Sequence, residues 1–207
     1  MARTRAPRKQ HADGTPENRL IDAALALAAR QGWRRTSLAE IAEEAGLKLH
    51  EAYALHRSKG AILAAFVRRT DLSVLEGAAP DAHESARERL FDTMMRRFDA
   101  LKPHRGAVRA IVRDGIGHPS SLLGMALLKR SMRWMLEASD ISTVGCKGRL
   151  LIQGTMALHL SVLRVFLADD SADLARTMAA LDRGLRRGES LCRLLPRGRR
   201  KAEATAA

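Results

Sequence analysis

Apolar residues recur at every third or fourth position over residues 18–33, the first helix that the sequence predicts. The apolar face of this helix carries Leu20, Ala24, Leu27 and Ala28. Because this spacing matches the 3.6-residue turn of an α-helix, we expect the face to be buried. Asn18 is a suitable N-cap for the helix, and Gly32 is a suitable end.

A capping-box spacing marks the start of the next predicted helix, in the segment TSLAEIAEEAG of residues 36–46. Ser37 and Glu40 are three residues apart, so each side chain can bond the other's backbone N–H. Gly46 can supply the left-handed residue that ends the helix. The segment LKLHEAYAL of residues 47–55 then begins another short helix at once. Two short helices joined by a tight glycine turn follow the helix-turn-helix plan.

Helix-turn-helix units bind DNA with their second helix in the major groove and with the N-terminus of the first helix near a phosphate. This plan predicts DNA contacts for Arg34, Thr36, Ser37, Lys48, Leu49, His50, Tyr53 and Lys59. An ordinary solvated helix face is the alternative for Lys48, His50 and Tyr53. The other two polar residues at the first cap, Thr36 and Ser37, cap a helix under either interpretation.

Helical spacing continues through most of the remaining chain, and the composition favours it. Aromatic residues make up only 3% of the sequence and hydrophobic residues 46%, so Ala, Leu, Val, Ile and Met must build the core. We therefore predict an all-α fold. A run of small and turn residues, GAAPDAHE, indicates a domain boundary near residue 78. The expected units are a disordered basic arm (1–17) and a helix-turn-helix domain (18–78). A helical ligand-binding and dimerisation domain (79–195) and a disordered basic tail (196–207) follow them.

A seven-residue repeat runs along the last predicted helix. Its apolar positions alternate in steps of four and three, which is the spacing of a helix that packs along a partner helix. The residues of this predicted dimer seam are Leu174, Met178, Leu181, Leu185 and Cys192.

Methionine and aromatic residues recur on the helices of the second half, where they are candidates for lining a ligand pocket. Methionine side chains adapt to irregular apolar ligands. The candidate residues are Met94, Phe98, Met125, Trp134, Met135, Met156 and His159. Ordinary core filling is the alternative for each methionine, and a satisfied core histidine is the alternative for His159.

The net charge, the cysteines and the absence of catalytic or metal-binding motifs limit the classes of function that this sequence can have. The formal net charge is +13, which suits a polyanionic partner such as nucleic acid or an acidic membrane surface. Cys146 and Cys192 match no metal or redox spacing, and their free form suits a reducing cytoplasm. No run of 18 apolar residues is present, so no transmembrane helix is predicted. No nucleophile–base pair or metal-ligand spacing is evident, so we predict neither an enzyme nor a cofactor.

The stretch RLIDAALALAARQGWRRTSLAEIAEEAGLKLHEAYALHRSKGAILAAF resembles the N-terminal domain of TetR-family transcriptional repressors. The matching features are the Gly32–Trp33 step, Thr36–Ser37, the segment IAEEAGL, Tyr53 and Ser58–Lys59. The resemblance implies an all-α homodimer that binds a palindromic double-stranded DNA operator. It also implies a C-terminal domain that binds a small apolar ligand, which releases the DNA, and that dimerises through its last two long helices.

Several positions depart from the pattern of the family. The family usually has a small polar residue at Lys48, often Gly or Pro near His50, Leu at Ala52, an aromatic residue at His56 and often Glu at Gly60. The changes at Lys48 and His50 fall on the predicted DNA-reading helix. They are therefore expected to affect DNA recognition more than the fold.

A second resemblance suggests an alternative function. The segment DDSADLARTMAALDRGL, residues 169–185, is similar to the C-terminal part of the lipid-binding ubiquinone-biosynthesis family, which shares the TetR fold. That resemblance implies an apolar pocket for an isoprenoid lipid and an accessory role in quinone synthesis. Peripheral membrane contact through the Arg-rich last helix belongs to this alternative.

Overall fold

Helices account for the regular structure of the residues that the computed structural model describes, which are 14–77, 83–117 and 120–194. Within these ranges there is no strand, so the predicted all-α fold is confirmed. The elements are α1 (Pro16–Gln31), α2 (Leu38–Glu44), α3 (Leu49–Leu55), α4 (Lys59–Glu76), α5 (Ala86–Leu101), the 3-10 turn η1 (Lys102–His104), α6 (Arg105–Gly115), α7 (Ser120–Ala138), α8 (Gly145–Leu167) and α9 (Ala175–Leu194).

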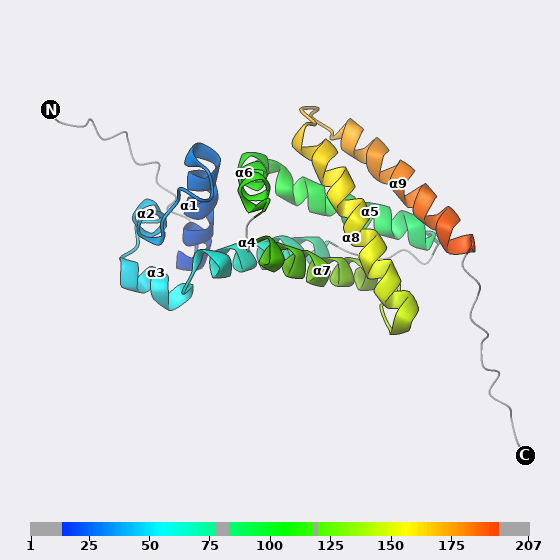
Figure 1. The fold of residues 1–207 in the computed structure, drawn as a ribbon, viewed down its shortest axis with the longest axis horizontal. Coiled ribbons are helices and arrows are strands. Elements are labelled where there is room, and N and C mark those ends of the chain that lie inside the picture. Colours follow the sequence, from blue (N-terminus) through cyan, green and yellow to red (C-terminus); the bar gives the residue numbers. More distant parts are fainter. Residues whose placement is uncertain (1–13, 78–82, 118–119, 195–207) are drawn as a thin grey trace, which may run out of the picture.

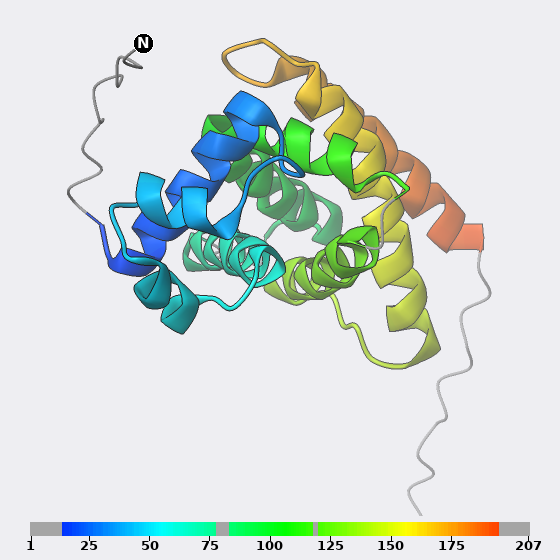
Figure 2. The same ribbon diagram turned by 60° about the vertical axis from the view of Figure 1, so that its left-hand side comes forward.

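The helices α1, α2 and α3 lie together at one end of the molecule, and α8 and α9 lie toward the other end (Figure 1). Helix α4 begins beside the first three helices and packs against α1, α5 and α7. Helix α6 packs closely on α1, although the two are far apart in the sequence (Figure 2). α4 and α6 are therefore the elements that join the N-terminal helices to the rest of the protein.

The starts of the first helices follow from local hydrogen bonds. Ser37 and Glu40 form the predicted capping box of α2, and Gly46 has the predicted left-handed backbone, with φ 68°. The predicted N-cap of α1 was wrong, because Thr15 accepts the backbone N–H of Asn18 at 3.3 Å. Helix α1 therefore begins two residues before Asn18 and includes two residues that we assigned to the basic arm. Residues 1–13 of that arm, the predicted boundary near residue 78 and the predicted tail 196–207 lie outside the described residues.

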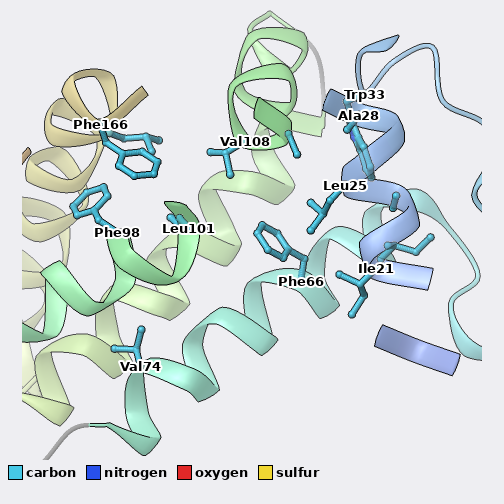
Figure 3. Packing of buried hydrophobic residues seen from close by; sticks show 14 of the residues in the cluster. Ile21, Leu25, Ala28, Trp33, Phe66, Val74, Phe98, Leu101, Val108 and Phe166 are labelled. Carbon is cyan, nitrogen blue, oxygen red and sulfur yellow. The ribbon is translucent and has the colours of Figure 1, made fainter. Parts of the chain in front are cut away.

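Apolar side chains from almost every helix meet in one core. Phe66 of α4 lies between α1 and the second half of the chain, and Phe98 of α5 faces Phe166 of α8 (Figure 3). The rings of Phe98 and Phe166 are 5.3 Å apart between centroids, in a tilted arrangement. Because aromatic residues are few, the remaining buried side chains are chiefly Leu, Ala, Ile, Val and Met, as the composition predicts.

Three residues of the predicted dimer seam face the protein's own core, which corrects our prediction that they face a second copy. Leu174, Leu181 and Leu185 are buried in the hydrophobic core, and α9 packs on α8 and α5. Met178 is 42% exposed, and the side chain of Cys192 lies outside the described residues. For Leu174, Leu181 and Leu185 the periodicity identified buried positions, but these residues pack within the same chain.

The corner between α8 and α9 is closed by one buried carboxylate, Asp169. The Oδ2 atom of Asp169 accepts the backbone N–H of Thr177 at 2.8 Å and its hydroxyl at 2.7 Å. The Oδ1 atom accepts the hydroxyl and the backbone N–H of Ser171. Burial by itself raises the pKa of Asp169, but the hydrogen bonds from Ser171 and Thr177 together hold it well below its usual range.

Asp169→Asn is expected to lower the free energy of unfolding by about 1–3 kcal/mol at pH 7, because an amide nitrogen cannot accept these hydrogen bonds. A carboxyl group with a lowered pKa in the folded state stabilises the fold above its unfolded-state pKa, and this stabilisation is lost as the pH falls below it. The stability gap between parent and variant should therefore narrow below about pH 4. Urea unfolding at pH 7 and pH 3 measures the gap, and an equal gap at both values would contradict this role.

Candidate nucleic-acid interface

Helix α3 is held on the protein by one side and leaves the other side exposed. Ala52 is buried against the core, and the backbone N–H of Lys48 donates to the Glu51 carboxylate at 2.6 Å, which fixes the first turn. The small side chain at position 52 lets this short helix lie close to α2, on which it packs. The arrangement fits the helix-turn-helix plan that the sequence predicts.

The exposed side of α3 and its N-cap carries four of the residues that we predicted to contact DNA, namely Lys48, Leu49, His50 and Tyr53. Leu49 is 56% exposed and Tyr53 is 59% exposed, which is unusual for side chains of this size. The four side chains share one short stretch of helix surface, where a cation, an imidazole and a phenol are available to a partner. The dimensions of a short protruding helix suit the major groove of DNA.

The N-terminus of α2 offers a second exposed group beside α3. Arg34, Arg35 and Ser37 are exposed there. The Ser37 hydroxyl donates to the Glu40 carboxylate and accepts the backbone N–H of Glu40. Backbone N–H groups at a helix N-terminus and nearby guanidinium groups favour a phosphate. This geometry agrees with the predicted phosphate contact of Arg34 and Ser37.

Two of the predicted DNA-contact residues point inward instead. Thr36 is buried, and its hydroxyl donates to the Gly32 carbonyl at 2.9 Å. The Lys59 ammonium donates to the carbonyls of Trp33 at 2.6 Å and Thr36 at 2.7 Å, and it lies 5.0 Å from the centre of the Trp33 ring. Burial lowers the pKa of Lys59, while Asp114 and Glu40 oppose this effect. We therefore correct both assignments: Thr36 and Lys59 hold the loop before α2.

A carboxylate of α6 holds the same loop from the other side, and no sequence signal identified it. Asp114 accepts the backbone N–H of Arg34 at 3.1 Å. The hydrogen bond from Arg34 lowers the pKa of Asp114, although burial acts in the opposite direction. Arg113 and the Trp33 backbone lower this pKa further. Gly32 has a φ of 91°, and a Cβ there would lie 3.1 Å from the Asp114 carboxylate. The loop at the start of α2 is thus positioned by both α4 and α6.

Asp114→Ala is expected to weaken operator binding about tenfold, because the loss of this hydrogen bond releases the loop that orients α2 and α3. Asp114→Asn is the matched control, since it keeps an oxygen that accepts from Arg34 and should lose less affinity. Fluorescence anisotropy with a labelled operator duplex measures both variants. Unchanged affinity in the alanine variant would show that α6 does not position the DNA-binding surface.

Most of the predicted ligand-pocket residues gather in the interior between α5, α7 and α8. Five of them are buried, namely Met94, Phe98, Met135, Met156 and His159. The other two do not join them: Met125 is 41% exposed and Trp134 is 52% exposed, on the outer side of α7. Those two assignments are corrected, because residue type and helical spacing alone did not tell which side of α7 faces the core.

A buried ion pair joins three helices beside these residues and was not predicted. Arg97 of α5 donates to Asp71 of α4, and the Ser131 hydroxyl of α7 donates to the other Asp71 oxygen at 2.8 Å. Burial lowers the pKa of the Arg97 guanidinium, and the charge of Asp71 opposes this effect. Asp71 and Arg97 are 26 residues apart. A charged residue on an otherwise apolar helical face was the one available signal.

Within the described ranges, no three His, Cys, Asp or Glu side chains gather as a metal site would require. One helix, α8, is long and apolar enough to cross a membrane by length and composition, which a core helix of a soluble protein also satisfies. Its mean hydropathy reaches 1.6 over an 18-residue window, but α8 packs on α7 and α9. These observations leave the surface of α2 and α3 as the candidate site with the clearest chemistry.

An exposed helix-turn-helix unit at one end of an all-helical protein is typical of DNA-binding transcriptional regulators. Residues 20–66 match the model of bacterial regulatory proteins of the tetR family. The chain therefore has the N-terminal domain of the TetR family, and its overall fold is that of TetR-family transcriptional regulators. No match was found among curated proteins.

Solved structures of such regulators share the fold along most of the chain. A TetR transcriptional regulator from Nitrosomonas europaea is 22% identical, with a TM-score of 0.70, and the match covers 86% of this chain and 99% of that one. A TetR transcriptional regulator from Rhodococcus sp. RHA1 is 18% identical, with a TM-score of 0.61 and coverage of 83% and 93%. The fatty acid degradation regulator FadR from Bacillus halodurans is 17% identical, with a TM-score of 0.58 and coverage of 86% and 96%. The alternative role in ubiquinone biosynthesis gains no support from these matches.

Proposed function

We propose that this protein is a cytoplasmic transcriptional repressor that binds a palindromic DNA operator as a homodimer, without enzymatic activity. The observation that carries the proposal is the exposed surface of α3, where Lys48, His50 and Tyr53 project beside the N-terminus of α2. The TetR-family match over residues 20–66 supports it. We assign residues 18–78 to DNA binding and residues 79–195 to ligand binding and dimerisation.

Each exposed residue of this surface has a role under the proposal. Lys48, Leu49 and His50 reach base edges or the nearest phosphates, and the Tyr53 hydroxyl donates to a phosphate. Arg34 and Ser37 bind a phosphate at the start of α2. In the proposed homodimer, each copy brings one recognition helix to one half of a two-fold symmetric operator, and the half-sites lie about one helical turn apart.

The outer side of α8 is the surface that we assign to the second copy. This side carries Leu150, Gly154, Ala157 and Ser161, which are exposed and repeat at helical spacing. Only 39% of the most apolar window of α8 is buried within one chain. Met178 of α9 lies exposed on the neighbouring helix. An apolar surface with small residues permits close helix packing, and a symmetric copy presents the same surface in return.

Ala157→Glu is the variant that tests this dimer surface, because two facing carboxylates at a two-fold axis repel each other and are stripped of water. Ala126→Glu, at an exposed position of α7, is the control. Light scattering after size exclusion should give a dimer for the parent and the control and a monomer for Ala157→Glu. A dimeric Ala157→Glu variant would exclude this surface as the interface.

A small apolar ligand completes the proposed mechanism. We place it in the buried cluster of Met94, Phe98, Met135, Met156 and His159, between α5, α7 and α8. Ligand binding there displaces α4 or α6, and these helices hold the loop before α2 through Lys59 and Asp114. A ligand that binds the displaced arrangement more tightly lowers the affinity for the operator.

Selection of random duplex DNA on the purified full-length protein tests the proposed function. The proposal predicts enrichment of a two-fold symmetric sequence, because each protomer reads one half-site. The enriched sequence should also be found upstream of a gene that the protein controls in its source genome. Enrichment of no sequence after repeated rounds would refute specific operator binding.

A further inference from the structure

Two deeply buried side-chain nitrogen atoms, one on α5 and one on α8, have no hydrogen-bond partner among the described residues. They are Nε of Arg97 on α5 and Nδ1 of His159 on α8. Arg97 is 4% exposed and His159 is 3% exposed. His56 and Arg105 also have a buried nitrogen atom without a hydrogen bond, but their side chains are more exposed, and Nε2 of His56 lies 3.2 Å from the Glu17 carboxylate. Buried polar atoms without a partner are uncommon in folded proteins, so this pair requires an explanation.

The side chains that carry the two nitrogen atoms are linked through Phe98 and by an electrostatic interaction. The His159 ring stacks on the ring of Phe98, with 5.1 Å between centroids and 12° between planes. Phe98 directly follows Arg97 on α5, and the Arg97 charge acts on His159. Asp71 and Ser131 complete the polar side of the cluster, and both are already paired. Arg97 Nε and His159 Nδ1 are the atoms of these four side chains that are buried without a hydrogen-bond partner among the described residues.

The cluster carries no net charge near neutral pH. Arg97 is compensated by Asp71. Burial, aided by the nearby charge of Arg97, lowers the pKa of His159 to about 3, so its imidazole is neutral. Arg97 Nε always carries a hydrogen and can only donate, whereas a neutral imidazole nitrogen donates or accepts according to its tautomer. The missing partner must therefore accept a hydrogen bond from Arg97 Nε. The cluster has no unpaired positive charge that would favour an anion as this partner.

We propose that Arg97 Nε and His159 Nδ1 together bind an uncharged oxygen, the carbonyl or hydroxyl group of a small and otherwise apolar molecule. This inference deepens the proposed function, because it names the chemical class of the ligand that acts on the repressor. A carbonyl accepts from both nitrogen atoms, and a hydroxyl accepts from Arg97 and donates to His159. A carboxylate fits less well, since it adds a negative charge to a buried cluster whose charges are already balanced.

The surrounding side chains fit the apolar remainder of such a molecule. Met94 lies one helical turn before Arg97 on α5, and Met156 lies one turn before His159 on α8, and both are buried. Met132 and Met135 of α7 are buried next to Ser131 on that helix. Methionine side chains are unbranched and flexible, so they can move aside for an alkyl chain at lower cost than branched residues.

The test uses the full-length protein and three probes of equal chain length, which are 2-nonanone, 1-nonanol and nonanoate. Isothermal titration at pH 7 measures binding to the parent and to variants. The ketone or the alcohol should bind at least about tenfold more tightly than the carboxylate, a ratio that corresponds to the strength of one ordinary hydrogen bond. Equal or tighter binding of nonanoate would overturn the assignment of an uncharged oxygen.

Two variants remove the nitrogen atoms one at a time and keep the rest of the cluster. His159→Phe preserves a ring that stacks on Phe98, and Arg97→Lys preserves a positive charge beside Asp71. Each should weaken ketone and alcohol binding about tenfold, and thermal melting confirms that each variant is folded. Met156→Leu is the control, because it alters only the apolar wall and should change the affinity for all three probes alike.

Three results would overturn this inference: none of the probes binds, the carboxylate binds best, or both variants bind the ketone and the alcohol as the parent does. Operator binding is measured on the same preparations. A protein that binds operator DNA but none of the probes keeps the proposed function and loses only the ligand class. A protein that binds the ketone or the alcohol but no DNA has the ligand site without the proposed regulatory function.

Discussion

Replacing Lys48, His50 and Tyr53 together with alanine is expected to weaken operator binding by at least about a hundredfold. Each good contact to a base edge contributes about 1–3 kcal/mol of discrimination, and the loss of Lys48 removes one charge from the phosphate interface. The three side chains are exposed on α3, so the fold loses little when they are removed. Fluorescence anisotropy at fixed salt concentration gives the affinity, and thermal melting gives the stability.

A matched triple variant separates recognition from general charge. Lys129, Arg130 and Arg133 are exposed on α7, and their replacement with alanine removes more positive charge than the α3 variant does. This control should change operator affinity by only a few fold, because its charges lie away from the helix-turn-helix unit. If the two triple variants bound the operator equally well, α3 would not be the recognition helix.

Asp71→Leu is expected to lower the free energy of unfolding by about 3–5 kcal/mol, which is the usual effect of leaving a buried charge without its partner. Arg97 would then be buried with its guanidinium uncompensated, and the Ser131 hydroxyl would lose its acceptor. This loss of stability should be among the largest of any single substitution. Asp71 bonds both Arg97 and Ser131 and so joins α4, α5 and α7. Urea unfolding followed by circular dichroism measures it.

The double variant Asp71→Leu/Arg97→Met tests whether the loss comes from the unpaired charge. Removing both charges replaces the pair with apolar groups of similar size, which is often close to neutral for stability. The double variant should therefore recover most of the stability that the single variant loses. A double variant as unstable as Asp71→Leu would show that the ion pair stabilises the fold beyond compensating its own charges.

Local sequence patterns predicted much of the fold because the interactions behind them are local. The Ser37–Glu40 capping box joins residues only three apart. The turn at Gly46 depends on the backbone freedom of one residue. The start of α1 was misplaced by two residues, because Thr15 and Asn18 are both good caps and only one of them is used.

Contacts between distant residues escaped prediction. Asp114 bonds Arg34 across 80 positions, and Lys59 bonds Trp33 across 26. Nothing in either local sequence shows which face of its helix meets the loop before α2. Lys59 was assigned to DNA for the same reason, since a lysine at a helix start serves a phosphate or a backbone carbonyl equally well.

Periodicity identified buried rows without identifying what buries them. Leu174, Leu181 and Leu185 repeat as a helix seam requires, yet their partners are α8 and α5 of the same chain. Met125 and Trp134 have the right residue types for a ligand pocket but lie on the outer side of α7. The tertiary arrangement decides which helix packs against which face. The spacing of apolar residues within one helix does not identify its packing partner.

Competition between the selected operator and a scrambled duplex of the same length tests the central claim most directly. The two duplexes are titrated against the full-length protein near physiological salt concentration. A specific repressor should prefer the operator by at least about a thousandfold and should bind it as a dimer. Equal affinity for the two duplexes, falling together as salt is raised, would contradict operator recognition and leave only charge-driven binding.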